Sequence, residues 1–195
     1  METNILQNHI NKTVSLSEDE FSNVALFFEE KRFKKREIII RENDPVNHVY
    51  FIVSGLLKLF YTDAEAKEHI VSFAMEDWWE SDYAAFYTQS RATQSLQCLE
   101  DTVVLALSFD GYQKLLTEVP KMTGFFLKKA IGGHISNQRR ILSLMTMSAK
   151  ERYEQFLHYY PALMQRLPKT ALSAYLGVSR ETLSRLYWES GSKNK

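Results

Sequence analysis

The feature that most constrains this chain is a residue pattern between Lys169 and Glu189, near its C-terminus. Apolar side chains recur there at helical spacing: Leu172, Leu176, Val178, Leu183 and Leu186. Gly177 interrupts them where a sharp turn needs a backbone that tolerates positive φ. Ser179 follows, and its side chain can cap a second helix. The pattern predicts two short helices joined by a tight turn, a helix-turn-helix.

The exposed face of the second predicted helix carries side chains that suit duplex DNA. Arg180 and Arg185 can donate to guanine O6 and N7, and Glu181 can accept from cytosine N4. The hydroxyls of Thr182 and Ser184 can touch phosphate or base, and the cap at Ser179 leaves the first backbone amides facing a phosphate. An ordinary helical hairpin is the alternative, and the combination of cap, glycine and Arg-Glu-Thr disfavours it.

The charge of the chain is divided between its two parts, although the net charge is zero. Residues 1–120 carry 11 Lys and Arg against 20 Asp and Glu, a net −9, and residues 121–195 carry 13 against 4, a net +9. A basic half suits a polyanion, because each neutralised phosphate releases condensed counterions. It equally suits a solvated helix surface. We expect the acidic half to stay off the DNA.

Composition narrows the class of protein. At 195 residues with 45% hydrophobic and 25% charged side chains, the chain fits two modest, well-packed domains. It has no apolar run long enough for a membrane span, and its N-terminus lacks a basic segment followed by an apolar core. The single cysteine, Cys98, excludes an internal disulfide and a cluster held by several cysteines of one chain. We expect a cytoplasmic protein.

The acidic part predicts one helix followed by short strands. Ser17 and the three acidic residues after it, with Phe and Val at helical spacing, predict a capped helix over 16–35. Runs of β-branched and aromatic residues then alternate with turn formers, over 37–41, 49–53, 56–61, 68–74, 93–99 and 102–108. Strands at this spacing predict a compact antiparallel β barrel or roll.

The basic part predicts only helices. A short helix over 109–119 precedes a long one over 121–147, with Pro120 in its first turn. An apolar seam follows the long helix: Leu127, Ile131, Ile135, Leu142 and Met145, with Gln138 in the same series. The seam suits either a partner helix or the helix's own domain. Gly132–Gly133 indicates close backbone approach or a bend. A further helix begins after Ser148, Pro161 disturbs its end, and Gly191–Lys195 predicts a disordered tail.

Three of these segments resemble the Crp/Fnr family of bacterial transcription regulators. The run 179–186 is similar to its recognition helix, 49–59 to its barrel signature with Gly55 at the glycine turn, and 121–147 to its dimer helix. The resemblance implies an α+β fold. It has an antiparallel double-stranded β-helix (a jelly-roll or cupin-like barrel of the cyclic-nucleotide-binding type) over 1–119, a dimerisation helix over 120–147 and a winged-helix-like domain over 148–195. The chain ends soon after the recognition helix, so we expect a truncated wing.

The resemblance also implies partners. Lys169 and Thr170 match the start of the first helix, where phosphate contacts are common. A homodimer joined through 120–147 would read a pseudo-palindromic duplex, and RNA polymerase would be a further partner. These implications make the chain a regulator and not an enzyme, with no catalytic residues and no membrane contact.

The resemblance implies an effector site in the barrel, formed by Ser81, Arg91 and Thr93, with Ser136 and Asn137 near the base of a bound nucleotide. Ser136 and Asn137 equally fit a solvent-facing role. Acidic residues crowd this site: Glu76, Asp77, Glu80 and Asp82. Like charges at close range oppose a phosphate. We therefore expect no cyclic nucleotide and no assured cofactor, but an unidentified small-molecule effector.

Other chemistries fit less well. An aromatic group could line a different pocket or belong to the core: Trp78, Trp79, Tyr83, Phe86 and Tyr87. Cys98 could be a redox switch or a buried, inert thiol. The histidines show no tight ligand spacing, so no metal is expected. The alternative function is a cupin-type metal-dependent enzyme with a helical tail, which needs clustered ligands that the sequence lacks.

Overall fold

The computed structural model describes residues 2–191 of the chain, which form two compact units. Unit 1 comprises Met1–Tyr61 and Val71–Gly132, and unit 2 comprises Thr62–Ile70 and Gly133–Lys195. The long helix α5 (Lys121–Thr146) contributes to both units. The disordered tail predicted at the C-terminus lies, from residue 192 on, outside the described residues.

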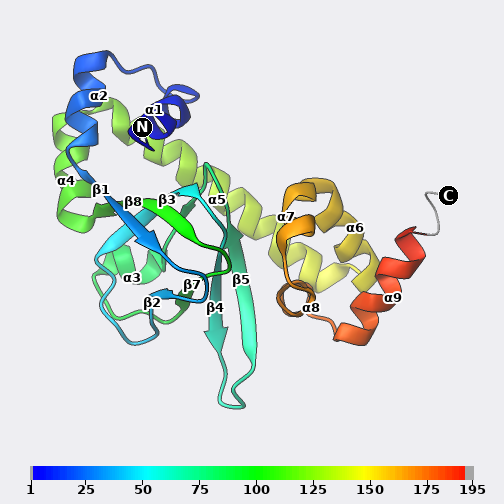
Figure 1. Cartoon of the computed structure of the whole chain (residues 1–195). Coiled ribbons are helices and arrows are strands. Elements are labelled where there is room, and N and C mark those ends of the chain that lie inside the picture. Colours follow the sequence, from blue (N-terminus) through cyan, green and yellow to red (C-terminus); the bar gives the residue numbers. More distant parts are fainter. Residues whose placement is uncertain (1, 192–195) are drawn as a thin grey trace. The chain divides into compact units, whose positions relative to one another are not determined.

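Two four-stranded sheets form the core of unit 1, as the alternation of strands and turns predicts (Figure 1). The strand pairs β1–β8, β2–β7, β3–β6, β3–β8 and β4–β7 are antiparallel. One sheet has the order β1 (Phe28–Phe33), β8 (Thr102–Ser108), β3 (His48–Ser54), β6 (Trp79–Glu80). The other has the order β2 (Ile38–Ile40), β7 (Ser95–Cys98), β4 (Leu57–Thr62), β5 (Glu68–Ala74).

The predicted helix over 16–35 is wrong in its second half. The helix α2 (Glu18–Ala25) ends early, and the next segment forms β1, which pairs with β8 from Phe28↔Leu107 to Phe33↔Thr102. Glu, Glu, Lys and Arg fill the middle of β1, so its local sequence does not predict a strand. The pairing with β8 determines its conformation instead. A helix not expected from sequence, α1 (Glu2–Asn11), precedes it and wholly buries Leu6 and Ile10.

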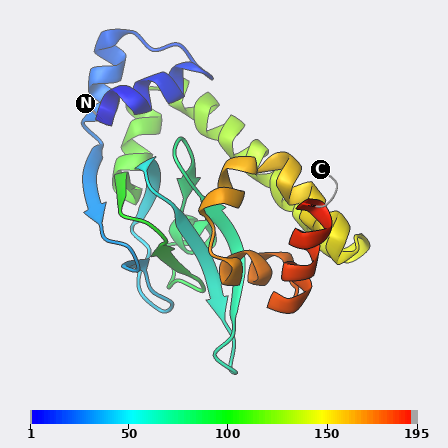
Figure 2. The same cartoon turned by 45° about the vertical axis from the view of Figure 1, so that its right-hand side comes forward.

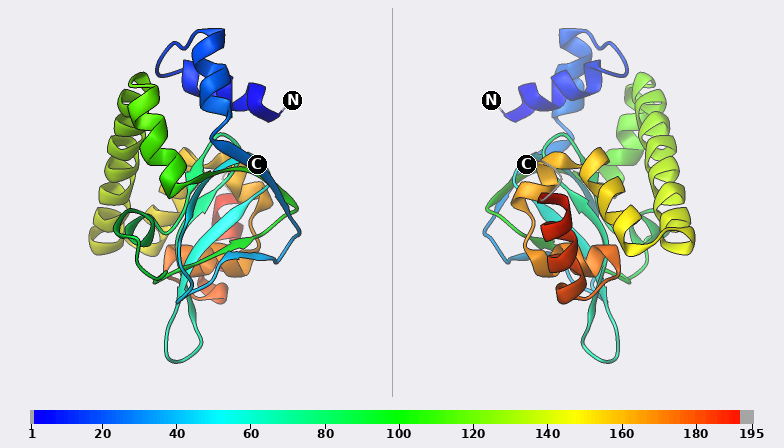
Figure 3. Two further views of the ribbon diagram at one scale, coloured as in Figure 1. Left: turned by 90° about the vertical axis from the view of Figure 1, so that its left-hand side faces the viewer. Right: turned by 90° about the vertical axis from the view of Figure 1, so that its right-hand side faces the viewer.

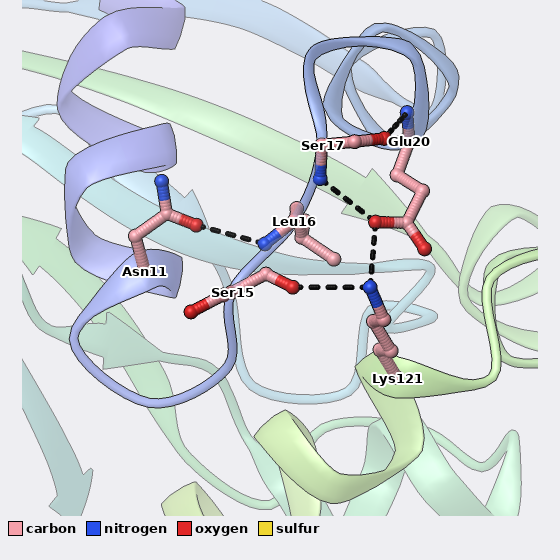
Figure 4. Close-up of polar contacts among 6 residues, drawn as sticks. All are labelled: Asn11, Ser15, Leu16, Ser17, Glu20 and Lys121. Carbon is pink, nitrogen blue, oxygen red and sulfur yellow. Dashed lines mark hydrogen bonds and ion pairs between the residues drawn. The ribbon is translucent and has the colours of Figure 1, made fainter.

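The start of α2 has the predicted cap. Ser17 Oγ accepts from the Glu20 amide and Glu20 Oε2 accepts from the Ser17 amide, which is a capping box (Figure 4). Lys121, in the first turn of α5, donates to Glu20 Oε2 at 2.8 Å and to the Ser15 carbonyl at 3.2 Å. The hydrogen bond from Lys121 lowers the pKa of Glu20. These contacts tie α5 to the connection between α1 and α2.

Gly55 makes the tight turn between β3 and β4 at φ +109°. A Cβ at this position would lie 2.4 Å from Thr102 Oγ1 and 2.8 Å from the Asp101 carbonyl oxygen. No side chain fits there, so the glycine turn expected from the barrel signature is required by packing as well as by φ.

The helices that follow the barrel agree with the sequence. The helix α4 (Phe109–Glu118) and the long α5 succeed each other around Pro120, and both are drawn in green tones in the left panel of Figure 3. The seam of α5 is exposed in the single chain, with exposed fractions from 49% to 77% at Leu127, Ile131, Ile135, Leu142 and Met145. A Cβ at Gly132 or Gly133 would meet nothing within 4 Å, so among the described residues nothing approaches these glycines closely.

Four short helices complete unit 2 and gather into one group, yellow to red in Figure 2. They are α6 (Ala149–Tyr159), α7 (Pro161–Arg166), α8 (Lys169–Leu176) and α9 (Arg180–Gly191). Ser148 caps α6 and the helix ends just before Pro161, both as predicted; the capping box with Glu151 and the new helix α7 that begins at Pro161 are not expected from the sequence. Within residues 2–191, no helix combines the length and the apolar character that crossing a membrane requires.

Candidate nucleic-acid interface

The turn between α8 and α9 has the predicted geometry. Gly177 takes a left-handed conformation, with φ 66°, and ends α8. The amide of Val178 donates to the Ser173 carbonyl at 3.0 Å, which closes the turn. Ser179 Oγ accepts from the Thr182 amide at 3.2 Å and so caps α9. The right-hand panel of Figure 3 shows the two helices, orange and red, side by side.

A small apolar core holds the two helices at this angle. Leu172, Leu176, Leu183 and Leu186 are at most 5% exposed, and Val178 is half-buried. Ser173, a small residue on the inner face of α8, is also buried, and its hydroxyl donates to the Thr170 carbonyl. Because both inner faces are filled, the charged side chains of α9 that follow Ser179 lie at the surface.

The outward face of α9 carries the predicted base-reading residues. Arg180, Glu181 and Arg185 are exposed, and Thr182 and Ser184 are half-buried. Hydrogen bonds to its own backbone amide and to Ser179 lower the pKa of Glu181, with a further contribution from the charge of Arg180. The Glu181 carboxylate is therefore ionised at neutral pH and is an acceptor only.

The start of α8 is also exposed. Lys169 and Thr170 lie at the surface, as does Ser179 at the cap of α9. Lys169 Nζ is 5.2 Å from the centroid of the Tyr187 ring, which belongs to α9. This contact brings the side chain of Lys169 towards α9, so the first turn of α8 and the face of α9 can present one continuous surface to a duplex.

Two arginines that sequence reasoning missed hold the end of α8. Arg152 Nε donates to the Leu176 carbonyl at 2.9 Å, and its Nη1 donates to the Met147 carbonyl at 2.6 Å. Arg140 Nη2 donates to the Tyr175 carbonyl at 3.0 Å. Cations suit the C-terminal end of a helix, where carbonyls lack partners. No periodicity marks these residues, because their partners on α8 are backbone carbonyls 24 and 35 residues along the chain.

Unit 2 also contains a pocket of about 420 Å³, a volume that includes space open to solvent. Its lining includes Ser136, Arg139, Arg140, Arg152, Tyr159 and Tyr160. Ser136 Oγ lies 3.4 Å from the Tyr160 hydroxyl, and Asn137 is exposed. These two predicted effector residues belong to unit 2, whereas the other three belong to unit 1.

In unit 1 the structure gathers two of the three predicted effector residues around Asp82. Ser81 precedes it and donates to the His48 carbonyl at 2.9 Å. Thr93 donates to Asp82 Oδ2 from its amide at 2.8 Å and from its hydroxyl at 3.1 Å. Arg91 turns away and donates to the Asn43 carbonyl at 2.7 Å. The expected cation therefore does not take part in this cluster.

Of the four acidic residues expected around the effector site, only Glu80 and Asp82 lie with Ser81 and Thr93. Glu76 accepts from the Gly55 amide, and Asp77 pairs with Lys12, so both have other partners. Glu80 is buried, and desolvation raises its pKa to about 7, with Asp82 contributing in the same direction. Ser72 Oγ and the Ser81 amide donate to the Glu80 carboxyl group.

Of the two interpretations of the aromatic group, a separate pocket or part of the core, the structure supports the core. Phe86 is wholly buried, while Tyr83 and Tyr87 are partly exposed and stack on each other. Trp79 packs among aromatic rings and donates from Nε1 to His9 Nε2 at 3.2 Å.

The structure gives little support to a redox sensor at Cys98 or to a metal sensor. Burial raises the pKa of Cys98 to about 11, so its thiol is protonated and unreactive at neutral pH. Within residues 2–191, no group of three or more His, Cys, Asp or Glu side chains could hold a metal ion.

Comparison with known proteins agrees with this arrangement. The family described as cyclic nucleotide-binding domain matches residues 30–118. The anaerobic regulatory protein of Haemophilus influenzae is 29% identical over 186 residues, which is 88% of this chain and 71% of that protein. The regulatory protein HlyX of Actinobacillus pleuropneumoniae is 28% identical over 189 residues, covering 88% and 76%.

Solved structures share the fold. FixK2 from Bradyrhizobium japonicum superposes with a TM-score of 0.76 at 18% identity, covering 86% of each chain. A CooA mutant from Carboxydothermus hydrogenoformans gives a TM-score of 0.70 at 20% identity, covering 96% of this chain and 84% of that one.

Proposed function

Because the chain belongs to the Crp/Fnr family of transcriptional regulators, we propose that it is a homodimeric regulator that reads duplex DNA through α9. The observation that carries the proposal is the exposed face of α9, which a leucine core and a capped turn hold in place. Arg180, Glu181 and Arg185 lie on that face with their charged ends at the surface. It belongs to the half of the chain with a net charge of +9.

The proposed roles follow from the donors and acceptors of each side chain. Arg180 and Arg185 read guanine, and Glu181 accepts from cytosine N4. Lys169, Thr170 and Ser179 contact phosphates and fix the register of the protein on the duplex. Thr182 and Ser184 supply shorter polar contacts to base or backbone.

We propose that a second copy covers the exposed seam of α5. Five large apolar residues at least 49% exposed form an unusual surface for a single chain, and their three- and four-residue spacing suits a parallel helix pair. A two-fold pair would place two recognition helices about 34 Å apart, on successive major-groove faces of a pseudo-palindrome. The functional division is then a sensor barrel over 1–119, a dimerisation helix over 120–147 and a DNA-binding domain over 148–195.

The barrel is proposed to sense a small effector other than a cyclic nucleotide. Arg91 bonds to a backbone carbonyl, and the buried carboxyl groups of Glu80 and Asp82 accept from Ser81 and Thr93 of the proposed effector site, where their negative charge would oppose a phosphate. The chain acts by binding and not by catalysis, in the cytoplasm with its DNA and with RNA polymerase as the proposed further partner.

Fluorescence anisotropy with duplexes from the chain's own upstream region tests the proposal. Arg180→Ala and Arg185→Ala each remove a base contact, so each should weaken binding to the specific duplex by roughly 10- to 100-fold. Lys114→Ala, which removes an exposed lysine of α4 in the acidic half, is the matched control and should leave the affinity unchanged. Wild-type protein that shows no salt-dependent duplex binding, or binding that survives both arginine changes, would refute the proposal.

A further inference from the structure

The side chain of Asp82 is wholly buried and receives four hydrogen bonds. Its Oδ1 accepts from the Ala85 amide at 3.1 Å, which is the ordinary capping contact of the short helix α3 (Tyr83–Thr88). Its Oδ2 accepts from the Thr93 amide at 2.8 Å, the Thr93 hydroxyl at 3.1 Å and the Gln94 amide at 3.2 Å. Helix capping accounts for the first contact only. The other three donors come from a separate segment and converge on one oxygen.

Three convergent neutral donors form a binding site for one oxyanion. Arg91 supplies no positive charge here, because its guanidinium group donates to the Asn43 carbonyl. Glu80 is buried nearby and opposes any additional negative charge. The donors therefore suit a single monovalent oxyanion better than a phosphate dianion.

We propose that Asp82 is a built-in ligand, whose carboxylate fills an oxyanion site made by Thr93 and Gln94. In the native chain the Asp82 carboxylate therefore accepts from the donors that an anionic effector would need. Thr93 lies at the surface, so removal of the carboxylate opens the site to a small carboxylate from solution. This inference rests on the effector part of the proposed function and is independent of DNA binding.

Chemical rescue tests the built-in ligand. Asp82→Ala leaves the donors of Thr93 and Gln94 without an acceptor, and the melting temperature should fall by about 5–10 °C. Sodium formate at about 0.2 M, which supplies the missing carboxylate, should restore at least about half of that loss. Sodium chloride at the same ionic strength should restore none of it.

Asp82→Asn is the matched control. Its amide fills the same space and keeps an oxygen acceptor, so the loss should be smaller and formate should not change it. Equal effects of formate on wild type, Asp82→Asn and Asp82→Ala, or no effect on Asp82→Ala, would overturn the proposal. If Asp82→Ala does not fold in chloride, the refolding yield in formate against chloride gives the same decision.

Calorimetry of the wild-type protein with cyclic AMP supplies a second test. We expect no binding heat, because Asp82 already occupies the donors. Binding of cyclic AMP that Thr93→Val weakens at least about tenfold would overturn the proposal, because the donors would then serve an external ligand. Duplex binding that survives both the Arg180 and the Arg185 change would refute the proposed function while leaving the rescue result unaffected.

Discussion

The polar groups of two regions are arranged in opposite ways: those of the cassette, the cluster of Glu80, Asp82, Thr93 and Gln94 in the barrel, and those of the exposed face of α9 with Arg180, Glu181 and Arg185. Around Asp82 the carboxylate is wholly buried, and the donors of Thr93 and Gln94 point at it. On α9 the charged ends of Arg180 and Arg185 lie at the surface. In the first region the polar groups bond to one another inside the fold, whereas in the second they are exposed to solvent.

The difference shows that a motif and its binding capacity are separate properties. The two domains that contain these regions each keep a glycine turn that the sequence predicts, at Gly55 in the barrel and at Gly177 between α8 and α9. A buried polar group must find its partner within the fold, whereas an exposed one can exchange water for a ligand at little cost. Side-chain exposure, and not resemblance to a motif, therefore decides which region is open to a ligand.

The two positive-φ glycines give the largest expected contrast. Gly55→Ala would place a Cβ 2.8 Å from the Asp101 carbonyl oxygen, so backbone must move, and we expect a loss of about 3 kcal/mol or more in unfolding free energy. At Gly177 a Cβ would lie 3.9 Å from Leu144 Cδ2 and meets only backbone strain, which costs about 1–2 kcal/mol. Urea unfolding of both variants measures the difference. Equal losses would show that the barrel is no more tightly closed than the helix-turn-helix.

The closed cassette should also make stability depend on pH. Burial raises the pKa of Glu80 from 4.5 to about 7, so between these values the native state binds more protons than the unfolded state. Its contribution is fully present below about pH 4.5 and is lost as pH rises through 7, a change on the order of 3 kcal/mol. Glu80→Gln should be more stable than wild type at pH 8, and this advantage should shrink towards pH 4.5.

Urea unfolding across this pH range measures the Glu80 effect. Glu65→Gln, on an exposed turn, is the control for the loss of one carboxyl group at the surface. A Glu80→Gln difference that does not change with pH would show that folding does not shift the pKa of Glu80, and that the cassette is less closed than its burial indicates.

The sequence predicts the two regions unequally, for a physical reason. The helix-turn-helix follows from local signals, because its leucines, Gly177 and Ser179 lie within a short segment and act on one another. The closure of the barrel cassette depends on Asp82 meeting Thr93, a pairing that only the fold creates. Sequence reasoning therefore placed Asp82 near Ser81, Arg91 and Thr93 as a source of repulsion, and did not predict that its carboxylate accepts from Thr93. The same limit concealed β1, whose partner β8 lies far along the chain.

The rigidity of the helix-turn-helix depends on arginines that donate hydrogen bonds to backbone carbonyls. Arg152→Ala removes charged donors from the Leu176 and Met147 carbonyls, and we expect unfolding free energy to fall by about 2 kcal/mol. Arg139→Ala is the control, because Arg139 is exposed and its guanidinium carbon lies 4.5 Å above the Tyr159 ring, a contact worth about 0.5–1 kcal/mol. Calorimetric unfolding distinguishes them. If both variants lose the same stability, the bonds of Arg152 to the end of α8 do not fix the turn.

The smallest expected changes in stability concern the glycines of α5. They test whether a second chain packs against the surface of this helix. A Cβ at Gly124, Gly132 or Gly133 would meet nothing within 4 Å in the single chain, so each change to Ala should raise stability by about 1 kcal/mol. Gly124 is the internal control in the same helix. A gain at Gly124 that is absent or reversed at Gly132 and Gly133, together with weaker dimerisation by analytical ultracentrifugation, would show a second chain packed closely against this pair. Equal gains at all three positions with unchanged dimerisation would leave the glycine pair solvated and confine the proposed contact to the apolar seam.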